Sequence, residues 1–116
     1  MGFMDKVKAA AKNADSKAGE EIDKGKLRSK IGDEKREIEK LYAKIGTTYY
    51  DSLKDGSDVT CELKTYCGEI DEHKAKIVEY EEEIKKVEEE GKKEREHNRE
   101  VAEAASKKDS EEKSEE

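Results

Sequence analysis

The sequence predicts an all-α protein: an elongated antiparallel coiled-coil helical hairpin with a short N-terminal amphipathic helix and a disordered C-terminal tail. Three observations favour this fold. Proline is absent and 49% of the residues are charged. Apolar residues recur in alternating steps of four and three in both halves of the chain, which is the heptad spacing of a helix with one buried stripe. A glycine with polar capping residues separates the halves, as in a hairpin of two helices.

Composition excludes several classes of function. Leu, Ile, Val and Phe account for 17 of the 116 residues and Trp is absent, so a closed apolar pocket of the kind that small-molecule enzymes use is not expected. The net charge of −7 disfavours binding to a phosphate backbone. We therefore expect no enzymatic activity, no catalytic residues, no cofactor or metal, and no nucleic-acid partner.

Residues 1–18 are predicted to form an amphipathic helix, because apolar and alanine side chains share one helical face with lysines beside it. Such a helix meets anionic lipid in peripheral membrane proteins. The candidate membrane or partner contacts are Phe3, Met4, Val7, Lys6, Lys8 and Lys12. The alternative is that this helix packs against residues 88–105 and extends the bundle.

Residues 19–26 are predicted to be a hinge. Gly19 and Gly25 bracket this segment, and each glycine costs about 1 kcal/mol in a helix interior. At the other end of the chain, residues 106–116 contain no apolar side chain. Such a segment cannot bury enough surface to offset its chain entropy, so an acidic disordered tail is expected there.

Residues 27–105 are predicted to form the coiled-coil hairpin, with its turn near residues 54–58. Gly56 can end the first helix in a left-handed cap, and Ser57 or Asp58 can cap the second. The first half of the chain is mildly basic and the second is strongly acidic, so the two arms attract each other. The expected seam consists of Leu27, Ile31, Ile38, Leu41 and Ile45 against Leu63, Ile70, Ile77, Ile84 and Val87.

The cysteines and histidines offer little chemistry. Cys61 and Cys67 are six residues apart and point about 120° apart on a helix, so they cannot bridge within it. We interpret them as small fillers beside the seam; a metal or redox site that uses them with His73 would need ligands from another molecule. His73 occupies a core heptad position, where a polar side chain can set register, or can act as a pH switch.

Three tyrosines near the predicted turn form a candidate hairpin-tip surface: Tyr42, Tyr49 and Tyr50. Together with Tyr66 they either pack the tip or present a binding surface. We favour packing.

Several stretches carry a resemblance to a known group of proteins: residues 1–7 (Met-Gly-Phe-Met-Asp-Lys-Val), 31–38, 41–46 with Tyr49 and Tyr50, and 67–77. They resemble short, mostly uncharacterised coiled-coil proteins of Firmicutes-type bacteria that begin with an amphipathic helix. The resemblance covers roughly residues 1–87 and implies a helical hairpin. Many members of that group end in a zinc ribbon with paired CxxC motifs. This chain has no CxxC, so no zinc ligand is implied for it.

The sequence thus favours a non-catalytic small coiled-coil interaction or scaffold protein of the bacterial cytoplasm, with an unknown protein partner and self-association through any free seam. The cytoplasm is expected because the first residues lack the apolar run of a signal peptide and the two cysteines provide no disulfide framework. The alternative is a peripheral protein at the inner face of the cell membrane that binds anionic lipid through its N-terminal helix.

Overall fold

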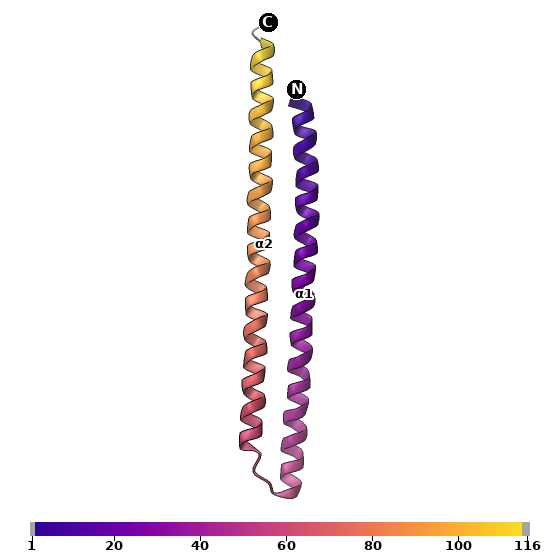
Figure 1. The fold of residues 1–116 in the computed structure, drawn as a ribbon, viewed down its shortest axis with the longest axis vertical. Coiled ribbons are helices and arrows are strands. Elements are labelled where there is room, and N and C mark those ends of the chain that lie inside the picture. The colour runs from indigo at the N-terminus through magenta and orange to yellow at the C-terminus, as the bar shows by residue number, and fades with distance from the viewer. Residues whose placement is uncertain (1, 115–116) are drawn as a thin grey trace. The chain divides into compact units, whose positions relative to one another are not determined.

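Two long helices account for nearly all of the chain in a computed structural model that describes residues 2–114, with side chains described for residue 4 and for residues 6–105. Helix α1 comprises Gly2–Asp55 and helix α2 comprises Thr60–Ser114. The chain reverses in the loop of residues 56–59 between them (Figure 1). No strand occurs within residues 2–114. The predicted all-α hairpin is confirmed.

The loop shows why the chain reverses at this point. Gly56 adopts a left-handed backbone conformation with φ of 73°, and its N–H donates a 2.8 Å hydrogen bond to the Ser52 carbonyl. This glycine therefore ends α1 as predicted. The Asp58 carboxylate accepts hydrogen bonds from the backbone N–H of Thr60 at 3.1 Å and from its hydroxyl at 2.6 Å. These bonds lower the pKa of Asp58 and satisfy a free amide at the start of α2.

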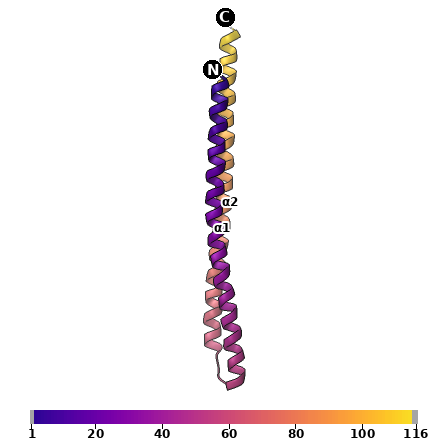
Figure 2. The same cartoon turned by 90° about the vertical axis from the view of Figure 1, so that its right-hand side faces the viewer.

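The chain divides into two compact units. Unit 1 contains residues Met1–Gly25 and Ile84–Glu116, and unit 2 contains residues Lys26–Glu83. Each unit therefore consists of one segment of α1 and one segment of α2. In unit 2 the two segments lie side by side in opposite directions in both views (Figures 1 and 2).

The bounds of the two helices bear on the predicted segments at both ends of the chain. Residues 1–18 and the predicted hinge of residues 19–26 do not form separate elements, because α1 is helical from Gly2 to Asp55. Each glycine costs only about 1 kcal/mol of helix stability, which does not interrupt a helix whose neighbouring residues form ion pairs. At the other end, the backbone of α2 is helical to Ser114, whereas the side chains of residues 106–116 lie outside the described set. Disorder of this tail stays a prediction.

The seam of unit 2 is apolar, as the heptad spacing predicts. Ile38, Leu41 and Ile70 form its buried cluster, and Ile45, Tyr66 and Ile77 pack against this cluster. A turn near Gly56 sets residue 41 opposite residue 70 in antiparallel arms, and Leu41 and Ile70 do lie in one cluster. One polar pair interrupts the seam: Nδ1 of the half-buried His73 donates a hydrogen bond to the Glu34 carboxylate. Glu34 also occupies a seam position, and the sequence did not reveal it as the partner of His73.

The seam of unit 1 is polar. Asn98 Nδ2 donates to Asn13 Oδ1 at 3.2 Å, and Ser16 Oγ donates to Glu94 Oε2 at 3.4 Å. Farther along α1, Lys24 Nζ lies 3.2 Å from Glu88 Oε1 and is nearly buried. Unit 1 thus adds hydrogen bonds and ion pairs to a small apolar contribution from residues such as Val87 and Ala102, where unit 2 uses isoleucine and leucine.

A buried glutamate lies at the centre of the polar seam. The side chain of Glu20 is only 3% exposed, and its Oε2 lies 3.3 Å from both Lys17 Nζ and Arg95 Nη1. Burial raises the pKa of Glu20, but hydrogen bonds from Lys17 and Arg95 outweigh burial and hold it below its ordinary value. The carboxylate fits because Gly91 lies opposite it: a Cβ at residue 91 would come within 2.8 Å of Glu20 Oε1.

The spacing of the seam changes at this layer. The least exposed positions of α1 step by four residues twice in succession at Ser16, Glu20 and Lys24, and those of α2 do so at Val87, Gly91 and Arg95. An extra step of four in a heptad pattern locally unwinds a coiled coil. Both segments of unit 1 carry this irregularity at the Glu20–Gly91 contact.

Candidate interaction face

Unit 2 carries large apolar side chains that its own seam does not cover. Tyr42, Tyr49, Leu53 and Val78 are between 51% and 67% exposed, and the Cys67 thiol is free and exposed. Single exposed apolar residues are common on protein surfaces and do not by themselves indicate a binding site. Their positions relative to the seam decide whether these five form a surface.

All five residues directly follow a seam residue in the sequence. Tyr42 follows Leu41, Tyr49 follows Thr48 and Leu53 follows Ser52 on α1, while Cys67 follows Tyr66 and Val78 follows Ile77 on α2. One residue is a turn of 100° on a helix. Because the helices of the pair run in opposite directions, a turn of the same sense from the seam brings both sets to the same side of unit 2. We call this set, Tyr42, Tyr49, Leu53, Cys67 and Val78, the tyrosine face.

The opposite side of unit 2 has a different character. The residues that directly precede seam positions there are charged apart from Thr47 and Thr65; they include Lys30, Glu37 and Lys44 on α1, and Glu62, Glu69 and Lys76 on α2. Lys30 Nζ lies 5.7 Å from the centre of the Tyr80 ring, a cation–π contact between the helices. Basic and acidic residues are present on both helices of this side, which therefore balances its charge within the chain. This side of unit 2 is almost entirely charged, whereas the side of the tyrosine face carries charged residues such as Lys35, Asp71 and Lys74 between its apolar ones.

The predicted tip surface is thereby divided. Tyr42 and Tyr49 belong to the tyrosine face, but Tyr50 does not: one residue farther along, it turns away from the seam, and its ring lies 4.6 Å from Lys54 Nζ. Packing, which we favoured for these tyrosines, is wrong for all three because each is at least half exposed. It is right for Tyr66, which packs against the buried cluster. Leu53, Cys67 and Val78 were missed as members of the face.

The interpretation of the cysteines as small fillers beside the seam fails on packing, although Cys67 does lie beside the seam. Both thiols are free and exposed. Cys67 lies on the tyrosine face, whereas Cys61 follows the seam residue Val59 by two positions and faces away from the pair. Among the described residues, no group of three or more His, Cys, Asp and Glu side chains is arranged to hold a metal ion.

The N-terminal candidate residues lie on unit 1. Met4 and Val7 are about half exposed, and Lys6, Lys8 and Lys12 are exposed; the side chain of Phe3 lies outside the described set. The hydrogen bond between Asn13 and Asn98 shows that this part of α1 packs against residues 88–105, as the alternative prediction had it. The packed side is the small and polar one, so Met4 and Val7 stay uncovered.

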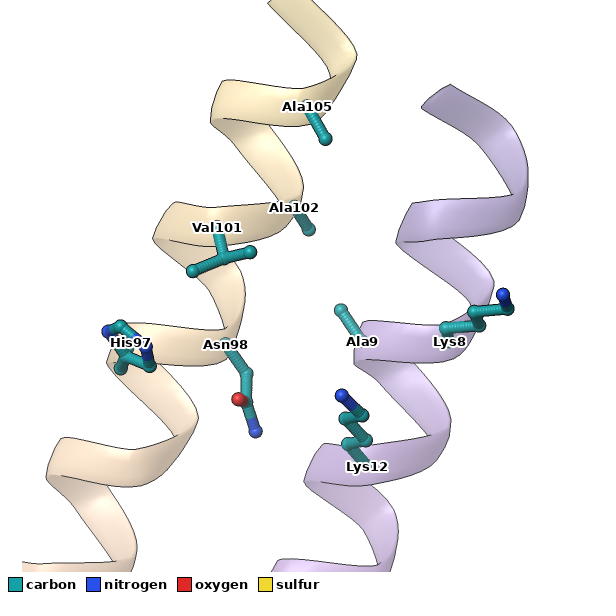
Figure 3. Close-up of a pocket in the computed structure, with 8 residues that line it drawn as sticks. All are labelled: Lys8, Ala9, Lys12, His97, Asn98, Val101, Ala102 and Ala105. Atoms are coloured by element: carbon teal, nitrogen blue, oxygen red, sulfur yellow. The ribbon is translucent and has the colours of Figure 1, made fainter. Parts of the chain in front are cut away.

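A shallow hollow of about 260 Å³ lies beside these residues in unit 1 (Figure 3). Ala9 projects from α1, and Ala102 and Ala105 project from α2, so short side chains leave the space between the helices unfilled. Lys8, Lys12, His97, Asn98 and Val101 complete its lining. The hollow combines two lysines of the predicted contact set with a small apolar floor.

These observations define a class: an antiparallel helical hairpin with an apolar seam in one unit, a polar seam in the other, and one uncovered apolar face. Searches find no matching protein-family model, no similar curated protein and no similar solved structure. Among the described residues, neither helix contains a stretch that is long and apolar enough to cross a bilayer.

Proposed function

We propose that the protein is a non-catalytic helical interaction or scaffold protein of the bacterial cytoplasm that binds a protein partner through its tyrosine face. The observation that carries this proposal is the grouping of Tyr42, Tyr49, Leu53, Cys67 and Val78, all exposed, on one side of unit 2. Tyrosine is enriched at protein interfaces because its ring adds contact area at low entropic cost while its hydroxyl stays hydrated. The charged opposite side keeps that side soluble.

Neighbouring tyrosines provide a matched test of this proposal. A photo-crosslinking benzoyl-phenylalanine is placed at residue 49, on the face, or at residue 50, which turns away from it. Both variants of the full chain are expressed in the cells that naturally make the protein. We expect adducts of defined mass from residue 49 and few from residue 50. Equal adduct formation from both positions, or none from residue 49, would contradict an interaction through this face.

A second candidate function is peripheral membrane binding. It is favoured by the exposure of Met4 and Val7 beside Lys6, Lys8 and Lys12, an arrangement that suits insertion into the headgroup region of an anionic bilayer. The test is co-sedimentation of the full chain with phosphatidylglycerol vesicles and with phosphatidylcholine vesicles. Binding to the anionic vesicles alone, abolished by the double variant Met4→Asp and Val7→Asp, is the expected result. No sedimentation with either vesicle would exclude this function.

A further inference from the structure

We infer that unit 1 binds an anionic lipid bilayer through an apolar stripe on the outer side of α1, while the inner side of the same helix stays packed against α2. This inference rests on the second candidate function, since it states which surface of the N-terminal segment meets the bilayer. The members of this outer stripe are all exposed: Met4, Val7, Ala11, Ala14, Ala18 and Ile22.

The outer stripe lies opposite the seam of unit 1. Each member from Val7 onward precedes a seam position by two residues, and these seam positions are Ala9, Asn13, Ser16, Glu20 and Lys24. Two residues turn a helix by about 200°, so the stripe points away from α2. Met4 continues the stripe three residues before Val7. From residue 4 to residue 22 the stripe is about 27 Å long, at 1.5 Å per residue.

The equivalent positions elsewhere in the chain are not apolar. On the α2 segment of unit 1, the residues two positions before the seam are charged; they include Lys85, Glu89, Lys93, Glu96 and Glu100. On the α1 segment of unit 2, the same positions include Ser29, Arg36 and Glu39. Exposed alanine alone needs no partner, because it is the best helix former. A stripe that excludes charge on one segment only, and that has Met4 and Ile22 at its ends, indicates a binding surface.

Lysines on both flanks of the outer stripe favour an anionic partner. Lys8 and Lys12 lie on one flank and Lys6 on the other, between about 80° and 120° from the middle of the stripe. Among the described residues none of these three forms an ion pair, whereas Lys17 and Lys24 each have glutamate partners. Lysine side chains in this position extend to lipid phosphates while the apolar side of the helix inserts.

The composition of the segment favours lipid over a protein partner. Residues 6–18 contain four Lys and a single acidic residue, Asp15, which lies at the margin of the stripe. Glu21 lies at the other margin and is paired with Lys17 and Lys24. Residues 4–22 contain no aromatic side chain, and protein interfaces are anchored mainly by large side chains in matched pockets. Short, uniform side chains with flanking lysines suit a fluid anionic surface.

The orientation of the stripe also implies that unit 1 stays closed on the bilayer. Interfacial helices insert their apolar side by about 5–10 Å, and here that side faces away from α2. The seam hydrogen bonds of Ser16 with Glu94 and of Asn13 with Asn98 therefore remain in place on binding. A helix whose apolar side was also its packed side would have to leave its partner first.

Co-sedimentation of the full chain with phosphatidylglycerol and with phosphatidylcholine vesicles tests the surface. We expect Ala11→Asp and Ala18→Asp each to weaken binding to phosphatidylglycerol vesicles about tenfold or more, because each places a charge within the stripe. The control Ala104→Asp makes the same change at an exposed alanine of α2 and leaves binding unchanged. The double variant Lys8→Gln and Lys12→Gln weakens binding roughly 25-fold, since each lysine near an anionic surface contributes about fivefold. Circular dichroism of each variant shows that the hairpin stays helical.

A cross-link between the helices tests the closed state. In a chain with Cys61→Ser and Cys67→Ser, the variants Ser16→Cys and Glu94→Cys are joined by a short bismaleimide. The same chain capped with N-ethylmaleimide is the unlinked control. We expect the linked and capped proteins to bind phosphatidylglycerol vesicles within about twofold of each other. A loss of binding of about tenfold or more on linking would show that α1 must leave α2, and would overturn the inference.

The failure of this inference is distinguishable from the failure of the second candidate function. If Ala11→Asp and Ala18→Asp bind normally while the Met4→Asp and Val7→Asp variant does not, only the first turns of α1 meet lipid and the inference is wrong. Equal binding to both kinds of vesicle would overturn the role of the lysines. If the full chain sediments with neither vesicle, both fail; a lipid-free dimer that Ala18→Asp dissociates would then assign the stripe to a second copy of the chain.

Discussion

Units 1 and 2 are both pairs of antiparallel helical segments, but different forces hold them together. In unit 2 the seam buries Ile38, Leu41 and Ile70, and removal of such side chains from water is the main source of stability in most folds. In unit 1 many of the corresponding positions are asparagine, serine, glutamate, lysine and arginine, joined by hydrogen bonds and ion pairs, and the apolar ones are few, among them Ile84, Val87 and Ala102. Heptad spacing thus specifies where the helices meet. The residue types at those positions determine how strongly the helices associate and how that association depends on pH and salt.

Each seam also has a different role in specificity. Apolar seams tolerate shifts in alignment, since one isoleucine can replace another in the same hole, whereas polar pairs have one satisfied arrangement. Glu20 with Gly91 and Asn13 with Asn98 therefore set the register of unit 1. In unit 2 the hydrogen-bonded pair of Glu34 and His73 sets the register. The comparison predicts that unit 2 carries most of the stability and unit 1 most of the sensitivity to pH and salt.

The largest expected effect comes from charge in the apolar seam. The double variant Ile38→Asp and Ile70→Asp buries two carboxylates that have no partner, which costs several times the ~3 kcal/mol of a buried isoleucine truncation. We expect loss of most far-UV helicity and of the melting transition. The control Ala75→Asp, at an exposed position of α2 outside the tyrosine face, is expected to change stability by less than about 1 kcal/mol. Unchanged helicity and melting in the double variant would contradict the hairpin.

A smaller effect, confined to unit 1, is expected on acidification. Because the pKa of Glu20 is lowered in the folded chain, its contribution to stability is complete above its ordinary value of 4.5 and is lost as the pH falls through the lower folded value. The variant Glu20→Gln lacks this contribution at every pH. Thermal melts followed by circular dichroism are expected to separate the two proteins at pH 7 and to converge as the pH falls below the folded-state pKa of Glu20. A constant difference across this range would show that the ionised carboxylate contributes nothing.

The smallest effect concerns two glycines of unit 1. At Gly25 an added Cβ meets nothing within 4 Å, so Gly25→Ala is expected to stabilise by about 1 kcal/mol through helix propensity. At Gly91 the same change displaces the Glu20 carboxylate and the gain is smaller. When Glu20 is also replaced by alanine, Gly91→Ala is expected to give the full gain in stability. Urea unfolding of the original protein, the two single variants Glu20→Ala and Gly91→Ala and the double variant measures the coupling free energy between the two positions. If the free-energy changes of the two single variants simply add in the double variant, the contact between Glu20 and Gly91 is contradicted.

Much of unit 2 could be predicted from the sequence, because its apolar residues are few and nearly all lie on one stripe. The walk from Leu27 to Ile45 and from Leu63 to Ile77 identifies positions that are all buried or half-buried. The turn at Gly56 was predictable because only a left-handed cap suits a glycine followed by Ser and Asp. Apolar periodicity is a strong signal wherever burial drives the packing.

The seam of unit 1 escaped the same reasoning because, beyond Ile84 and Val87, its positions are polar or small, with Ala102 as the buried apolar one. Glu20, Lys24 and Arg95 look like solvated charges in the sequence, and their spacing departs from heptads at the irregular step. Gly91 lies where the apolar periodicity of the second half ends, and nothing in the sequence marks it as the neighbour of Glu20. The one available signal was the combination of small or polar residues at matching levels of both arms. The tyrosine face was half visible: Tyr42 and Tyr49 were identified, but their side of the hairpin depends on the register.

The most direct test of the contrast between the units is amide hydrogen exchange, measured for each peptide of the chain at about 0.05 M and 1 M salt. At 1 M salt the Debye length is about 3 Å, so exposed ion pairs are weakened. We predict that amides of residues 31–45 and 63–80 are the most protected and change little with salt. Amides of residues 9–24 and 88–102 should be less protected at low salt and lose further protection at high salt. Equal protection of the two units, with the same response to salt, would contradict the account.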